Sequence, residues 1–400
     1  MRARTGSDKS PEGVTEHDVV ITGCGVQAPV GLGVSAFWDA LLAGRGAAAP
    51  IRRFAADDLT PNVAAEVAFG DDDPDRAGVL AVRAAAEALA DAHIDARAVG
   101  ANRLGVALGT TLGGMTIFER WDAGESVTPR ELARIPYYAP ATRVARQVNA
   151  RGPVATAQLA CASGTHALAL AASWVRSGRA DVVVAGGTDL LCRFVVAGFN
   201  SLRATSDVAR PFDRERKGLV LGEGAAILIV EAEAHARMRR ARIRARLAGV
   251  GAAADAVHMT APDREGAGAA RAIRAALDDA GADAAAVDFV SAHGTGTPYN
   301  DAMEAAALTR VFGACRVPVN SIKGAIGHTL GAAGALEAVL CVRVLETGLV
   351  PPTVGLRDLD PACATLDVVQ NEPRRVNARL AVSTSSGFAG ANAALVLAAA

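Results

Sequence analysis

The chain has 400 residues, 51% of them hydrophobic, 4% aromatic and 21% charged, and its formal net charge is −1. This apolar content excludes an intrinsically disordered chain, and the length is too great for one small core and suits two packed halves. The nearly neutral charge gives no long-range attraction to nucleic acid or to an anionic membrane, so we expect neither as a partner.

Residues 1–17 are polar and lack the apolar stretch of a signal peptide, and we expect them to form a mobile tail. No later stretch is apolar for long enough to cross a bilayer, so the sequence predicts no membrane insertion. The six cysteines have no CxxC spacing, which argues against a zinc site and against a disulfide framework. These features predict a cytoplasmic protein without a bound metal.

Residues 19–31, VVITGCGVQAPVG, predict a buried strand that runs into a glycine-rich turn. The glycines from Gly23 onward superficially fit the dinucleotide-binding fingerprint, which would suit an NAD-dependent dehydrogenase. That fingerprint needs a helix that begins directly on the glycines, whereas Pro29 and Gly31 interrupt this segment. We therefore favour a structural turn and keep the dehydrogenase as an alternative.

A weak internal repeat divides the chain. Residues 81–111 and 270–297 each predict an Arg/Ala/Leu-rich helix, a short linker, an apolar strand and a Gly-Thr turn. Residues 161–187 and 327–352 each begin with a turn of small residues and continue into an apolar helix. Alternating helices and strands without polar alternation predict an α/β architecture with a sheet covered on both faces. A chemical site is plausible where the equivalent turns of the two halves meet.

Cys161 lies in a turn of small residues directly before a long apolar helix, in LACASGTHALALAASWV. The N-terminus of a helix favours a thiolate at such a position, and the small neighbours leave room for a thioester. A small buried core residue is the alternative, since this is what most free cysteines are. The other five cysteines lack this setting, and we interpret them as core residues.

Two histidines follow apolar strands in glycine-rich turns. His293 lies in SAHGTGTPYND, and His328 follows Lys323 in SIKGAIGHTLGAAGALE. A single histidine is more often structural than catalytic, but two in glycine-rich turns at strand ends, each within a repeated unit, suggest a joint role. Neutral imidazoles can donate hydrogen bonds to a developing enolate or oxyanion without gaining charge themselves.

Five motifs in order resemble the β-ketoacyl synthase family, the elongating condensing enzymes of dissociated fatty-acid and polyketide synthases. They are ACASG, RPFDRERKGLVLGEGAAILIVE at 210–231, AHGTGTPYND, KGAIGHTLGAAGALE and SSGFAGANAALVL at 385–397. The resemblance implies an α/β thiolase fold, a pseudo-duplicated five-layered αβαβα sandwich. We expect residues 18–245 to form the half with the nucleophile and residues 246–400 the half with the histidine pair.

The resemblance also implies a reaction. Cys161 would be acylated by a primer carried on the phosphopantetheine of an acyl carrier protein. His293 and His328 would bind the malonyl thioester and promote loss of carbon dioxide, and the resulting enolate would attack the acyl-Cys carbonyl. Lys323 and Glu337 would orient the charges around the histidines. No metal and no organic cofactor would be needed.

The closing loop and the His293 turn complete the site that the resemblance implies. Backbone N–H groups of Cys161 and Phe388 would form an oxyanion hole, and Phe388 would gate the pocket between acylation and condensation. Thr295 and Thr297 would hydrogen-bond the pantetheine arm. The residues expected to bind substrate are Thr295, Thr297, Gly387 and Gly390.

Several positions depart from the family pattern. Leu159 stands where Thr is usual, and the closing loop changes the usual F-G-F-G-G-T-N at Ser386, Ala389 and Ala391. These departures favour a specialised type II polyketide or polyene pathway, with a housekeeping fatty-acid elongation synthase as the alternative. A non-catalytic partner of the same fold, a chain-length factor, is a further alternative. Such partners lack the nucleophile, so Cys161 argues against it.

The expected partners are an acyl carrier protein and a second subunit, which makes a homodimer or a heterodimer with a chain-length-factor-like chain. By family position, residues 110–140 would contribute to the dimer interface and the acyl pocket. The basic segment 235–246 either docks the acidic carrier or is an ordinary solvated face. Residues 255–262, DAVHMTAP, resemble a segment that lines the family's cleft, in which His258 suits a structural role as well as a functional one.

Overall fold

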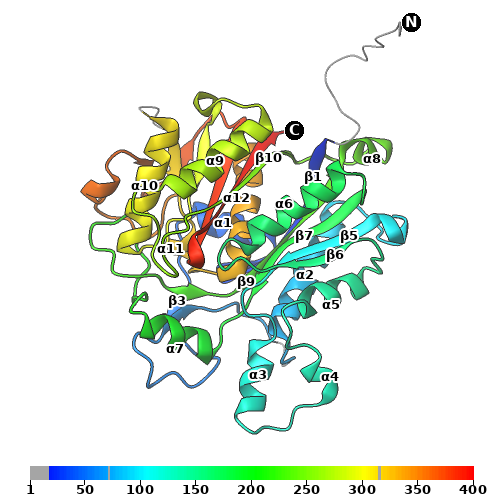
Figure 1. Ribbon diagram of the computed structural model, residues 1–400, viewed down its shortest axis with the longest axis horizontal. Helices are drawn as coiled ribbons and strands as arrows, with labels where there is room; N and C mark the ends of the chain where they lie inside the picture. The colour runs from blue at the N-terminus through cyan, green and yellow to red at the C-terminus, as the bar shows by residue number, and fades with distance from the viewer. Residues whose placement is uncertain (1–17, 71–72, 314–316) are drawn as a thin grey trace, which may run out of the picture.

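The computed structural model describes residues 18–70, 73–313 and 317–400, and the tail predicted over residues 1–17 lies outside them. Its main feature is a mixed sheet whose strands fall into two similar groups, one from each half of the chain. The two groups lie on either side of a central layer formed by helices α6 and α12 (Figure 1).

The N-terminal group has five strands in the order β6–β5–β7–β9–β1, so the first strand of this half lies beside the last. Three of them, β5, β6 and β7, are parallel, and β9 is antiparallel to both of its neighbours. The strands are β1 (Val19–Ala28), β5 (Leu104–Gly109), β6 (Val154–Ala157), β7 (Val182–Asp189) and β9 (Gly224–Ala232).

The C-terminal group repeats this pattern in the order β12–β11–β16–β17–β10, with the short β14 added outside β12. Again three strands are parallel and the last, β17, is antiparallel to both of its neighbours. The same strand order with the same antiparallel strand confirms the predicted duplication. The strands are β10 (Ala245–Ala254), β11 (Phe289–Ser291), β12 (Pro318–Asn320), β14 (Asp367–Val368), β16 (Leu380–Gly387) and β17 (Ala391–Ala399).

The two groups join where β1 pairs with β10, through Val20 with Arg246 and Ile21 with Ala245. Helices α2 and α5 cover the outer face of the N-terminal group, and α9 covers that of the C-terminal group with α10 beside it. The predicted five-layered αβαβα sandwich is therefore confirmed. The layer helices are α2 (Arg76–Asp91), α5 (Ala139–Gln147), α6 (Ser163–Arg176), α9 (Ala267–Ala280), α10 (Pro298–Phe312) and α12 (Ala333–Thr347).

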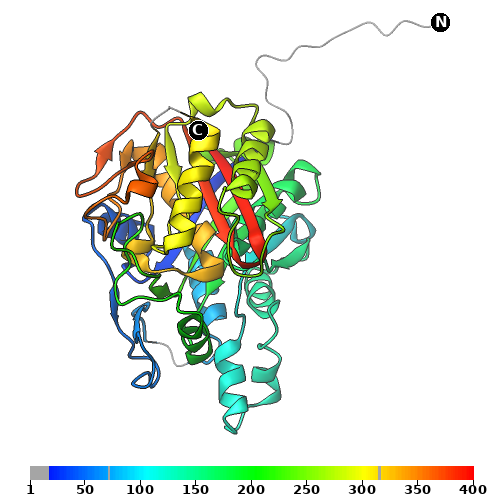
Figure 2. The same cartoon turned by 60° about the vertical axis from the view of Figure 1, so that its left-hand side comes forward.

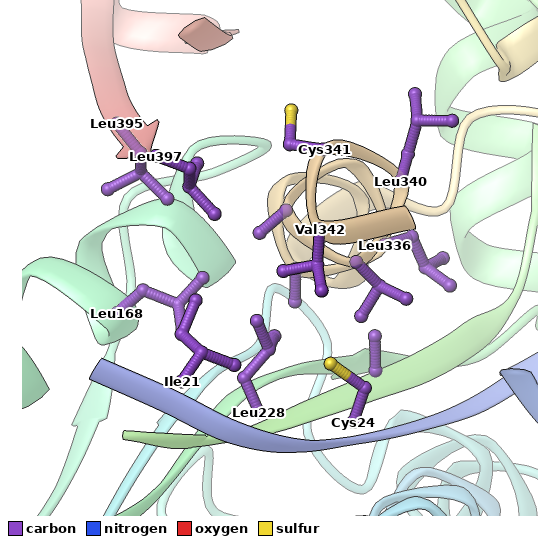
Figure 3. Packing of buried hydrophobic residues seen from close by; sticks show 14 of the residues in the cluster. Ile21, Cys24, Leu168, Leu228, Leu336, Leu340, Cys341, Val342, Leu395 and Leu397 are labelled. Carbon is purple, nitrogen blue, oxygen red and sulfur yellow. The ribbon is translucent and has the colours of Figure 1, made fainter. Parts of the chain in front are cut away.

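Apolar side chains fill the space between the central helices and the two groups of strands (Figure 3). Leu336 and Val342 of α12 point toward Leu228 of β9, while Leu395 and Leu397 of β17 lie on the other side. All five are fully buried, and each such side chain stabilises the fold by about 2 kcal/mol. The central layer is thus held by the strands of both halves.

Glycines explain how closely the helices approach the strands. Gly23 and Gly25 lie inside β1, where a Cβ atom would come within 2.2 Å of Ala88 O and 2.0 Å of Ala84 O in helix α2. These glycines therefore permit packing of α2 on the strand. They do not open a helix around a pyrophosphate, so the dinucleotide-binding alternative is excluded on structural grounds.

Helices α3 and α4 form an arm that projects from the layered body (Figure 2). It lies within the segment 110–140 that was predicted to reach a partner. The remaining helices are α1 (Val34–Leu42), α3 (Met115–Asp122), α4 (Pro129–Leu132), α7 (Arg193–Ser201), α8 (Glu233–Met238) and α11 (Lys323–Ile326). The remaining strands are β2 (Gly31–Leu32), β3 (Ala48–Pro50), β4 (Val63–Ala65), β8 (Leu221–Gly222), β13 (Leu349–Val350) and β15 (Arg374–Arg375).

Candidate active site

Cys161 is presented by a tight turn between β6 and the N-terminus of α6. Ala160 has a φ of 48°, a left-handed conformation that is unfavourable for a residue with a Cβ atom. Ser163 braces this turn, because its Oγ accepts from Leu159 N at 2.8 Å and donates to Ala160 O at 2.6 Å. The turn holds the cysteine, which is 6% exposed, directly before the helix, as predicted.

The protonation state of Cys161 differs from the expectation. Burial raises the pKa of its thiol to about 12, although the nearby charge of Lys323 acts in the opposite direction. In the unliganded protein, burial therefore outweighs the effect of the helix N-terminus, which was expected to favour a thiolate. Burial destabilises the thiolate more than the partial positive charge at the helix N-terminus stabilises it.

The side chains of His293 and His328, which come from two turns of the C-terminal half, lie next to each other. Their ring centroids are 5.2 Å apart at an interplanar angle of 85°, and each residue is 2% exposed. Burial lowers the pKa of both imidazoles well below the usual value, and the charge of Lys323 lowers both further. Both rings are therefore neutral near pH 7, which is the state predicted for hydrogen-bond donors to an anion.

Lys323 lies behind His293. Its Nζ is 3.2 Å from His293 Nδ1 and forms an ion pair with Glu337, and all these groups are buried. An ammonium group can only donate, so His293 Nδ1 accepts and the ring proton resides on Nε2. Burial raises the pKa of Glu337, and the charge of Lys323 lowers it. The predicted grouping of these residues is thus present in space.

Two carboxylates of α10, which the sequence analysis missed, fix the turn that carries His293. Glu304 accepts hydrogen bonds from the N–H groups of His293 and Gly294, each at 2.7 Å, and from Thr384 Oγ1 at 2.7 Å. Asp301 accepts from the N–H of Thr295 at 3.0 Å. Burial raises the pKa of Glu304 to about 7. Acidic residues three positions apart, directly after a Gly-Thr turn, were the available signal.

A cavity of about 340 Å³ brings the predicted residues together. Its wall includes Cys161, both histidines, both threonines and the first part of the closing loop. Thr295 Oγ1 and Thr297 Oγ1 lie 2.9 Å apart on this wall. The predicted site residues that line the cavity are Cys161, His293, Thr295, Thr297, His328, Gly387 and Phe388.

The closing loop lies against Cys161. A Cβ atom at Gly387 would come within 3.2 Å of Cys161 N, a tight contact that would require the neighbouring atoms to shift by a few tenths of an ångström. Phe388 stacks on Phe199 of α7, with centroids 5.6 Å apart and an interplanar angle of 19°. Gly390 has a φ of 72° and packs on Asp255 instead of lining the cavity. The loop turns away from the cavity after Phe388, so Gly390 lies off the wall where a substrate-binding residue was expected.

Most arginines of the basic segment 235–246 form ion pairs within the protein. Arg239 pairs with Glu231, and Arg244 pairs with Glu346. Arg246 pairs with Glu233. A surface most of whose guanidinium groups already have carboxylate partners offers less charge to an acidic carrier, so the alternative of an ordinary face is favoured.

The interpretation of the other cysteines as core residues is confirmed for those that the structure describes, Cys24, Cys192, Cys341 and Cys363. Cys315 lies outside the described residues. Within the described part of the chain, no group of three or more His, Cys, Asp or Glu side chains could hold a metal ion. No helix among residues 18–70, 73–313 and 317–400 is long and apolar enough to cross a membrane.

A duplicated thiolase fold with a cysteine at a helix N-terminus and two histidines on one cavity defines a condensing-enzyme class. The chain matches the model for the N-terminal domain of β-ketoacyl synthases over residues 16–236 and the model for their C-terminal domain over residues 244–357. It belongs to the β-ketoacyl synthase family.

Similar proteins occur in polyketide and fatty-acid synthesis. The chain is 40% identical to the ketoacyl synthase alpha subunit of the tetracenomycin polyketide synthase of Streptomyces glaucescens, over 96% of this chain and 97% of that protein. It is 38% identical to 3-oxoacyl-acyl-carrier-protein synthase 2 of Coxiella burnetii, over 95% and 98%. The solved structure of the ishigamide ketosynthase/chain length factor matches with a TM-score of 0.91 and 38% identity, over 96% of this chain and 100% of that one.

Proposed function

We propose that this β-ketoacyl synthase condenses an acyl group held on Cys161 with a malonyl thioester, and that His293 and His328 promote the decarboxylation. The observation that carries the proposal is the cavity that Cys161 and both neutral imidazoles line together. No step requires a metal or an organic cofactor.

The first half-reaction transfers the acyl group. The sulfur of Cys161 attacks the thioester carbonyl, the carbon–sulfur bond to the pantetheine breaks, and the proton of the Cys161 thiol passes to the departing sulfur. N–H groups of Cys161 and Phe388 serve the developing oxyanion. The closeness of Gly387 to Cys161 N supports this role for the closing loop.

The second half-reaction forms the new carbon–carbon bond. The malonyl carboxylate leaves as carbon dioxide, and His293 and His328 donate to the oxygen of the enolate that remains. The enolate carbon attacks the acyl-Cys carbonyl, the bond to sulfur breaks, and the thiolate takes one proton from solvent. The high pKa of the Cys161 thiol favours this final protonation. Lys323, paired with Glu337, keeps the proton of His293 on Nε2, so that Nε2 can donate to the enolate oxygen.

The outer wall of the cavity has features that favour substrates carried on an acyl carrier protein. Arg203 and Lys217 are exposed on this wall, where an acidic carrier could dock, and Thr295 and Thr297 lie within reach of a pantetheine arm. The similarity to a polyketide ketoacyl synthase supports a specialised type II pathway, and the similarity to a fatty-acid synthase keeps elongation as the alternative. A second subunit, identical or chain-length-factor-like, and a cytoplasmic location complete the proposal.

The test is acylation of Cys161 by acyl-carrier thioesters, followed by intact mass and peptide mapping. The unaltered protein should gain one acyl group on Cys161 and release it as a β-ketoacyl product when malonyl-carrier protein is added. Cys161→Ala should do neither, while Cys192→Ala, whose sulfur lies outside this cavity, should do both. Product formation by Cys161→Ala at the normal rate would refute the proposal.

A further inference from the structure

The segment between β10 and α9 forms part of the cavity wall. Thr260, Ala261 and Pro262 lie on the cavity together with Cys161 and Phe388. The base of this segment, residues 255–263, is closed by a hydrogen bond from Asp263 N to Asp255 Oδ2 at 3.0 Å. It therefore forms a compact loop whose tip faces the site, and it contains His258.

His258 organises the tip of this loop through one ring nitrogen. Its Nδ1 accepts from Thr260 N at 3.1 Å and from Ala261 N at 3.0 Å. An imidazole that accepts at Nδ1 carries its proton on Nε2. The ring thus fixes the backbone of Thr260 and Ala261, which face the cavity. It also fixes Met259, which lies between His258 and Thr260 in the chain.

The same loop is hydrogen-bonded to the closing loop on both sides of its turn. Ala389 N donates to Met259 O at 2.6 Å, and Asp255 N donates to Gly390 O at 2.8 Å. Ala389 has a φ of 62° and a ψ of 15°, which a residue with a Cβ atom adopts only when its surroundings hold it there. The bond to Met259 O is such a restraint, and it acts next to Phe388.

We propose that His258 is a positioning residue for the gate: by fixing Met259 it holds Ala389, and so keeps the ring of Phe388 stacked on Phe199 while the acyl-Cys reacts. This inference rests on the proposed function, since it concerns the fate of acylated Cys161. A closed site excludes water and protects the acyl thioester from hydrolysis. Loss of the restraint should therefore divert acyl groups from condensation to hydrolysis.

The test compares two replacements of His258. His258→Leu removes the acceptor, whereas His258→Asn supplies a side-chain oxygen that can accept from N–H groups two and three residues further on. After acylation and addition of malonyl-carrier protein, mass spectrometry measures the ratio of free acid to β-ketoacyl product. We expect the ratio to rise about fivefold in His258→Leu, with acylation within twofold of normal, and to return to normal in His258→Asn.

Two further variants make the result decisive. Val257→Ala, in the same loop with a side chain that is 65% exposed, should leave the ratio unchanged. His258→Ala is a second variant without the acceptor, for use should His258→Leu fold poorly. An unchanged ratio in the variants without the acceptor, or an equally raised ratio in His258→Asn, would overturn the inference. Failure of the unaltered protein to become acylated would instead contradict the proposed function.

Discussion

Lys323 shows how single residues set the chemistry of the cavity. Its ammonium group is 1% exposed and lies between Glu337 and the ring of His293. A buried charge without a partner is far more costly than a buried pair. The lysine is therefore both a structural partner of the carboxylate and the group that directs the His293 proton toward the cavity.

Replacement of Lys323 should affect both stability and decarboxylation. Lys323→Ala leaves Glu337 buried without its partner, and we expect the free energy of unfolding to fall by about 3 kcal/mol. Urea denaturation measures this fall, and carbon dioxide release from malonyl-carrier protein measures the loss of rate. The matched control is Arg214→Ala, which breaks an exposed pair with Asp358 and should cost about 0.5 kcal/mol or less. Similar costs for the two variants would contradict the proposed burial effect.

At the scale of elements, helix α10 and the closing loop position His293 and Cys161. The first turns of α10 bring Asp301 and Glu304 to the His293 turn, where their carboxylates accept hydrogen bonds from backbone N–H groups. The closing loop connects β16 to β17 and places Gly387 against Cys161. Both arrangements tie a proposed catalytic residue, His293 or Cys161, to a rigid element through backbone contacts, which favours precise geometry.

Glu304 makes stability depend on pH in a defined direction. Its pKa rises from 4.5 to about 7 on folding because it is buried, so its contribution to stability is full below pH 4.5 and is lost as the pH rises to about 7. In Glu304→Gln, we expect the free energy of unfolding not to show this fall with rising pH. Denaturation of both proteins at pH 5 and pH 8 measures the fall. Because other titrating groups remain in both proteins, the difference between them isolates Glu304, and parallel pH profiles would argue against the assignment.

Ala389→Gly and Gly390→Ala, at adjacent positions in the closing loop, should change the stability of the protein in opposite directions. Ala389→Gly removes the strain of a left-handed Ala, so we expect stability to rise by about 1 kcal/mol. Gly390→Ala should lower stability, because its φ is 72° and its new Cβ would lie 2.8 Å from Asp255 Cβ. Thermal unfolding of the two variants provides the comparison. A loss of stability in both would show that the loop does not depend on these backbone conformations.

At the scale of the whole molecule, one side carries features of an interface. Strand β6 is at the edge of the sheet, where backbone groups are available to another strand, and Val154 on it is 43% exposed. The projecting arm carries Trp121, which is 52% exposed. A second subunit that covers the edge strand would remove both features from water, in agreement with the expected dimer.

Charges on this side should weaken assembly. We expect the protein, alone or with its partner subunit, to have the mass of a two-chain assembly, and Val154→Lys or Trp121→Glu to shift it toward a single chain. Light scattering after size-exclusion chromatography measures the masses. Met238→Glu is the control, because Met238 is 77% exposed on α8, away from β6 and the arm. A monomeric unaltered protein, or unchanged assembly in both edge variants, would count against this interface.

Local patterns in the sequence predicted much of this protein. Apolar runs and alternating elements predicted the layered α/β fold, and similar segments predicted the duplication that the strand orders confirm. The small-residue turn before α6 predicted the position of Cys161, and the glycine-rich turns predicted those of His293 and His328. These features depend on neighbours in the chain, so they are visible without the fold.

Only the tertiary structure decided the electrostatic and long-range properties. Burial by distant segments raises the pKa of the Cys161 thiol, and most arginines of residues 235–246 are paired with carboxylates from several elements. The role inferred for His258 likewise depends on contact between loops more than 100 residues apart. Burial and pairing between remote segments determine pKa values and restraints, and the spacing of residues along the chain contains neither.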